Sequence, residues 1–152
     1  MDGACSYLKT KSIRLVQNTF RETVELFESE QSMLTYAIGD IHGCADHLHQ
    51  LLADIEEHCG GIPRKLVFLG DYIDRGPNSA GVIEHLRTLQ ASEPHDVVCL
   101  KGNHEDLMLG AYHVPGQRLN WLMNGGNKAL RSFGIDGPED LPSDVVQWVQ
   151  EL

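Results

Sequence analysis

Apolar and amphipathic segments alternate along the middle of the chain. The residues at 34–38, 65–69 and 96–100 predict three buried strands. Between them, segments 46–58 and 77–89 carry Leu, Ile and Val at spacings of three and four residues, which predicts two helices. This strand–helix–strand–helix–strand order with short connections favours an α/β fold with a parallel sheet and right-handed crossovers.

The remainder of the chain predicts helices without further strands. We expect helices over 104–112, 118–123, 127–133 and 144–152. Gly125 and Gly126 separate the second from the third, and Ser143 is expected to cap the last. Trp121 and Trp148 are interpreted as packing residues. Residues 1–32 carry no motif and predict only a weakly helical N-terminal extension, so the domain is expected to span 33–152.

Composition and charge narrow the possible functions. The chain has 152 residues, of which 41% are hydrophobic and 22% charged, as expected of one globular domain. Twelve Lys and Arg against 22 Asp and Glu give a net charge of −10, which argues against nucleic acid or an anionic membrane as a partner. The four cysteines form no CxxC pair, and no apolar run or signal-like N-terminus is present, so we expect a cytoplasmic protein without a membrane span.

Polar clusters follow all three predicted strands. They are Gly-Asp-Ile-His-Gly at 39–43, Gly-Asp-Tyr-Ile-Asp-Arg-Gly at 70–76 and Gly-Asn-His-Glu at 102–105. The carboxyl ends of parallel strands lie at one edge of a sheet, where open α/β folds bind ligands, so the clusters should converge. A single Gly-Asp after a strand is most often a turn, and a single Asp-Arg pair is most often a surface ion pair. The three clusters together favour a functional site.

The residue types in these clusters suit a metal centre. Asp40 and His42 are two residues apart, so in extended backbone their side chains point to the same side. Asp71 can bridge two cations with its two oxygens, and Asn103 offers a carbonyl oxygen. This mixture of oxygen and nitrogen ligands suits Mn, Fe or Zn better than Ca. Two such ions, about 4 Å apart, would activate a water and bind a phosphoryl oxygen.

In order and spacing, the three clusters resemble the signature of the calcineurin-like metallophosphoesterases. The fuller forms GDYIDRGP and KGNHE resemble the bacterial and phage serine/threonine phosphoprotein phosphatases, and the resemblance extends over 34–134, including WLMNGGNKALRSFG. It implies the N-terminal half of an αββα sandwich with two divalent ions, Mn²⁺, Fe or Zn. By the same resemblance, Asp40, His42 and Asp71 would bind the first ion, and Asp71 and Asn103 the second.

The resemblance also implies the residues that act on the substrate. His104 would protonate the leaving oxygen and Asp74 would orient it. Arg75 would bind the phosphate through its guanidinium fork. Lys101 stands where the family often has arginine, and because an ammonium lacks the fork we expect it to bind phosphate more weakly.

One part of the family pattern is missing. The family completes its second metal site with two downstream histidines, whereas His113 is the sole histidine after His104 and does not match either position. We therefore expect a C-terminally incomplete domain, at most one tightly bound ion, and an apolar sheet face left without its second sheet.

Three functions remain open from the sequence. The first is metal-dependent hydrolysis of phosphate monoesters, above all phosphoserine and phosphothreonine on proteins, by a metal-activated hydroxide. The second is hydrolysis of dinucleoside polyphosphates, although relatives with that activity tend to lack the second Asp of GDYIDRG, which is Asp74 here. The third is an inactive, truncated metal-binding fragment. A phosphorylated protein or another phosphate monoester is the expected partner.

Overall fold

The computed structural model describes residues 33–152, and the expected extension over 1–32 lies outside the described residues. Its strands are β1 (Leu34–Ile38), β2 (Arg64–Phe68) and β3 (Val97–Cys99). They form a parallel sheet in the order β1-β2-β3, with Ile38 beside Phe68 and Phe68 beside Cys99. The parallel α/β architecture expected from the sequence is confirmed.

One face of this sheet carries the fully buried residues of the strands. Ile38, Leu66 and Phe68 are at most 1% exposed, and Val97 and Cys99 extend the same apolar surface onto β3. Helices α1 (Ala45–Cys59) and α2 (Ser79–Ser92) contact each other, as expected when successive right-handed crossovers lie on the same side of a sheet.

The opposite face of the sheet is less protected. Its residues alternate with the buried ones and are half-buried or exposed: Thr35, Ala37, Lys65, Val67 and Val98. The strand sequences are almost continuously apolar, which is typical of strands covered on both faces. Among residues 33–152, however, the helices α1 and α2 cover one face.

Local sequence explains which side of α1 is buried and where α2 begins. In α1, Leu48 and Ile55 are buried, while Leu51 and Leu52 pack partly against the core. The α2 helix begins after Asn78, whose side-chain oxygen accepts the backbone N–H of Gly81 at 2.9 Å and satisfies one free donor of the first turn.

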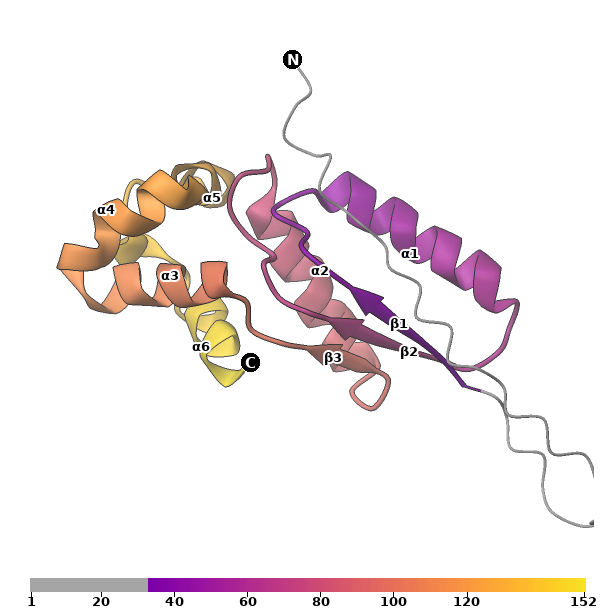
Figure 1. Cartoon of the computed structure of the whole chain (residues 1–152). Coiled ribbons are helices and arrows are strands. Elements are labelled where there is room, and N and C mark those ends of the chain that lie inside the picture. The colour runs from indigo at the N-terminus through magenta and orange to yellow at the C-terminus, as the bar shows by residue number, and fades with distance from the viewer. Residues whose placement is uncertain (1–32) are drawn as a thin grey trace, which may run out of the picture.

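The rest of the chain is helical, as expected. It comprises α3 (Asn103–His113), η1 (Pro115–Gln117), α4 (Arg118–Trp121), a turn η2 (Leu122–Gly126) that is kinked at Gly125, α5 (Asn127–Phe133), η3 (Pro138–Asp140) and α6 (Ser143–Glu151). Ser143 does not cap α6: it is the first residue of the helix, after Pro142, and makes no capping bond. Figure 1 shows α3 to α6 gathered beyond the carboxyl ends of the strands. No helix among residues 33–152 is long and apolar enough to cross a membrane.

Candidate metal centre

Backbone hydrogen bonds join the loops that follow β1 and β2. The N–H groups of Ile41 and His42 donate to the carbonyl oxygen of Asp71 at 3.0 and 2.9 Å, and Gly43 donates to Tyr72 at 2.7 Å. The two loops are therefore fixed against each other independently of their side chains. The convergence expected from the strand-end clusters is present for these two loops.

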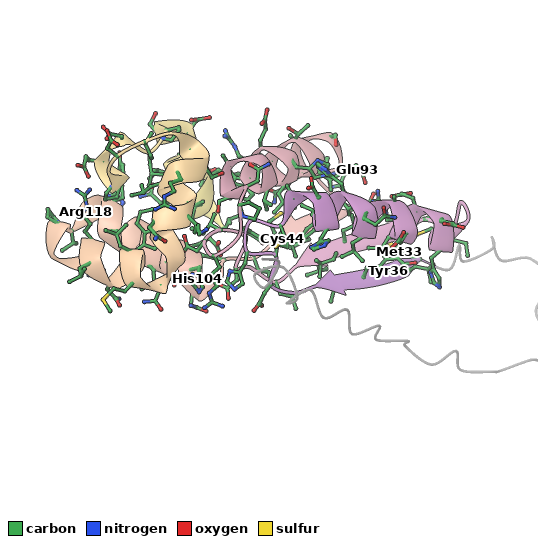
Figure 2. The ribbon with its side chains drawn as sticks, turned by 90° about the horizontal axis from the view of Figure 1, so that it is seen from above. Met33, Tyr36, Cys44, Glu93, His104 and Arg118 are labelled. Carbon is green, nitrogen blue, oxygen red and sulfur yellow. The ribbon has the colours of Figure 1, made fainter. Side chains whose placement is uncertain are left out.

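The loop after β3 joins them through α3. The backbone N–H of His104, in the first turn of α3, donates to Oδ1 of Asp71 at 3.0 Å. Figure 2 shows His104 where the sheet half of the molecule meets the C-terminal helices, far from Met33 at the start of β1. All three loops thus contribute to one site at the carboxyl edge of the sheet.

Three side chains in this site can ligate one metal ion. Ligand atoms of His42, Asp71 and His104 lie within 4.8 Å of one another. Asp40 is more exposed, and its Oδ2 lies 3.8 Å from Nε2 of His42. The two are close although His42 is not extended: its φ of 45° lies in the left-handed region. Asn103 is exposed at the first position of α3, directly before His104.

The imidazoles are oriented as cation ligands. Nδ1 of His42 lies 2.9 Å from the carbonyl oxygen of Ile73, to which it donates, so Nε2 carries the lone pair. The Arg75 guanidinium, which has donors only, lies 3.1 Å from Nε2 of His42 and 2.8 Å from Nε2 of His104. Both lone pairs therefore face a single positive charge. Together with the Asp71 carboxylate they make a donor set that fits a divalent transition metal.

His104 and Asp74 form a buried pair. Nδ1 of His104 lies 2.7 Å from Oδ2 of Asp74, and the side chains are 2% and 0% exposed. Burial raises the pKa of the Asp74 carboxyl to about 8, although the indole N–H of Trp121 opposes the shift. Burial lowers the pKa of His104, and His42 and Arg75 lower it further. Because Arg75 donates to Nε2, the His104 ring donates from Nδ1 to Asp74.

Backbone strain coincides with this site. The non-glycine residues with positive φ in the described part of the chain are His42, Asp71, Asp74 and Arg75, at 45°, 56°, 72° and 60°. Each such residue costs on the order of 1–3 kcal/mol and persists where its surroundings fix it. All four are residues that the sequence assigned to the site.

Two further residues support the site, and the sequence predicted this role for neither of them. The buried Glu105 carboxylate accepts backbone N–H groups from Asp71, Tyr72 and Gly102 at 2.8–2.9 Å. A glutamate three residues after a helix N-cap was the available signal, since this is the capping-box position. Trp121 is a packing residue as expected, but its Nε1 also donates to both oxygens of Asp74.

Lys101 pairs with an acidic residue of α3. Its nearest ionic partner is Asp106, with Nζ and Oδ1 4.0 Å apart, and 27% of its side chain is exposed. Its expected phosphate contact stays a prediction.

Comparison with known proteins identifies the family to which the sequence belongs. The family described as calcineurin-like phosphoesterase matches residues 33–148. Serine/threonine-protein phosphatase 1 of Salmonella typhimurium is 35% identical over 108 residues, which cover 70% of this chain and 45% of the relative. The symmetrical bis(5'-nucleosyl)-tetraphosphatase of Pseudomonas entomophila is 36% identical over 81 residues, covering 53% of this chain and 26% of the relative.

A solved structure shares the fold. It is described as a candidate diadenosine tetraphosphatase, and it superposes with a TM-score of 0.52 at 23% identity over 79% of this chain and 46% of its own. The chain thus spans less than half the length of these relatives. The chain belongs to the calcineurin-like phosphoesterases, a family of metal-dependent hydrolases.

Proposed function

We propose that the protein to which this chain belongs hydrolyses phosphate monoesters, with phosphoserine and phosphothreonine of proteins as its substrates. The contact of 2.7 Å between His104 and Asp74 carries the proposal, because it presents an oriented imidazole beside a cation-binding cluster. The second Asp of GDYIDRG is the feature by which this motif resembles protein phosphatases rather than dinucleotide hydrolases, and here that residue, Asp74, holds the imidazole.

In this proposal the cations are held by Asp40, His42, Asp71 and Asn103, whereas His104, whose ring also lies in the cluster of possible ligands, acts on the substrate instead. Manganese is the proposed ion, since it accepts both carboxylate and imidazole ligands. Divalent ions supply Lewis acidity, which acidifies a water and withdraws charge from a phosphoryl oxygen.

The chain's own side chains bind the substrate and move the proton. Arg75 can turn from the two imidazoles to a phosphate, where its fork matches two phosphoryl oxygens. Nε2 of His104 is then free to carry a proton to the leaving oxygen, while Asp74 holds Nδ1 and stabilises the charged ring. Lys101 adds positive charge at the rim. A net charge of −10 argues against nucleic acid as the partner, and the cytoplasmic location stays a prediction.

The test compares three substrates in the full-length protein. His104→Asn should lower turnover of a phosphoserine peptide by roughly 10²–10⁴-fold, the usual contribution of general acid catalysis. The loss should be smaller for nitrophenyl phosphate, whose leaving group needs no proton. An equal loss for both would show that His104 is not the acid. Faster turnover of diadenosine tetraphosphate than of the phosphopeptide would favour the dinucleotide hydrolases.

A further inference from the structure

The turn between α4 and α5 meets the catalytic loop at Asp74. Trp121, at the end of α4, is 0% exposed, and its Nε1 lies 3.1 and 3.0 Å from the two carboxylate oxygens of Asp74. An indole N–H can only donate, and both oxygens of the Asp74 carboxyl group can accept, so the contact is a hydrogen bond from Trp121 to Asp74. Forty-seven residues separate the two in the chain. A buried carboxyl group is thereby bound by a residue that is distant in the chain.

Two glycines allow this turn to approach so closely. A Cβ at Gly126 would lie 2.5 Å from Cδ2 of Trp121, so a larger residue there would displace the indole. A Cβ at Gly125 would lie 2.9 Å from the backbone nitrogen of Arg75, and its φ of 112° is itself unfavourable for other residues. The chain leaves the helical conformation at Gly125, so the turn is a kink between two helices, with Trp121 before it and Gly126 directly after it.

The loop that this turn contacts requires such support. Asp74 and Arg75 both have left-handed φ angles, which persist where surrounding contacts fix them. Within the loop, Asp74 donates its N–H to Oγ of Ser79 at 3.0 Å and accepts from the N–H of Gly76 at 2.6 Å. These bonds fix the backbone of Asp74. His104 and Trp121 are the side chains that bind its carboxylate.

We propose that the turn at 121–126 positions the catalytic pair. Trp121 fixes the Asp74 carboxylate and through it the ring of His104, while Gly125 and Gly126 make the close approach possible. Trp121 is a positioning residue, since it acts through Asp74. The consequence for catalysis rests on the proposed function, whereas the contact itself does not.

Trp121→Phe isolates the hydrogen bond, since it keeps an aromatic ring and removes the N–H. Trp148→Phe is the matched control. Trp148 also donates from Nε1, to Oε1 of Gln90 at 2.9 Å, but it lies on α6 and does not contact Asp74. Both variants thus lose one indole hydrogen bond, and one of the two bonds reaches the catalytic pair.

The first measurement needs neither metal nor activity. The sequence contains two tryptophans, so the chain has two indole N–H resonances, and Trp148→Phe assigns them. In the metal-free chain, Asp74→Asn should move the Trp121 resonance and speed its hydrogen exchange while leaving that of Trp148 unchanged. An unaffected Trp121 resonance would overturn the proposal. Because this measurement does not use Trp121→Phe, it tests the contact even if that variant fails to fold.

The second measurement reads catalysis in the full-length protein. Trp121→Phe should slow hydrolysis of a phosphoserine peptide by roughly 10- to 100-fold, part of the contribution of a general acid, and that of nitrophenyl phosphate much less. It should add no further loss to Asp74→Asn, and Trp148→Phe should leave both substrates unaffected. Equal slowing of both substrates would show a merely structural role. If the unaltered protein hydrolyses neither substrate, the proposed function is wrong. The resonance measurement still tests the contact between Trp121 and Asp74 in that case.

Discussion

The carboxylate of Glu105 accepts the backbone N–H of Asp71 at 2.8 Å, although 34 residues separate them in the chain. In return, the carboxylate of Asp71 accepts the backbone N–H of His104, the residue before Glu105. The loop after β2 and the first turn of α3 are therefore joined by two carboxylates, one from each side. One of these carboxylates is a metal-ligand candidate and the other is fully buried.

Glu105→Gln should weaken both the fold and the metal site. The amide cannot accept all of the N–H groups that now face the carboxylate, so the free energy of unfolding should fall by about 2–4 kcal/mol. Mn²⁺ affinity should fall roughly 10-fold or more, because Asp71 loses its fixed position. Urea unfolding and calorimetric titration measure the two effects. Glu84→Gln, an exposed change on α2, is the control, and equal behaviour of the two variants would refute the bracing role of Glu105.

Arg75→Met should strengthen metal binding while removing the phosphate contact. The guanidinium donates to Nε2 of both His42 and His104, so an incoming cation must displace it and overcome its charge. We expect Mn²⁺ to bind several-fold more tightly to the variant at low salt. The gain should not exceed roughly 10-fold, which is the effect on affinity of removing one solvent-screened charge repulsion. Arg87→Met is the control, since Arg87 pairs with Asp144. Unchanged or weaker binding to Arg75→Met would mean that the arginine does not occupy the ligand lone pairs in solution.

The sequence located the strands and the three polar clusters because each is a local signal. It did not give the geometry within the loops. Asp40 and His42 were expected to be close through an extended backbone, but His42 adopts φ 45° and the proximity depends on bonds to the loop of Asp71. Nor could it show that Trp121 reaches Asp74, because a tryptophan on a helix predicts packing and its partner lies 47 residues away.

His85, on α2, should make the fold sensitive to mild acid. Burial lowers the pKa of His85, the neighbouring ring of His49 lowers it further, and its Nε2 is buried without a partner among the described residues. His85 therefore binds a proton less readily in the folded chain than in the unfolded chain, where it is protonated below about pH 6.5. The contribution of His85 to stability is present above that pH and is lost as the pH falls.

His85→Phe removes this titration. The thermal midpoint of the variant, measured relative to that of the unaltered chain, should rise as the pH is lowered from about 8 to about 5.5, because position 85 of the variant takes up no proton in this range. His47→Phe, at an exposed position of α1, should show no such trend. A constant difference between His85→Phe and the unaltered chain across this range would contradict the prediction.

Calorimetric titration of the 152-residue chain with Mn²⁺, followed by a phosphatase assay on the same sample, tests the metal centre most directly. In the proposed site, His42, Asp71 and Asp40 would supply three ligands to a first ion, whereas a second would have only Asp71 and Asn103, and stable sites generally use three or four protein ligands. We predict at most one tightly bound ion per chain, loss of that binding in Asp71→Asn, and little or no turnover. Two tight sites with ordinary turnover, or undiminished binding to Asp71→Asn, would contradict this account.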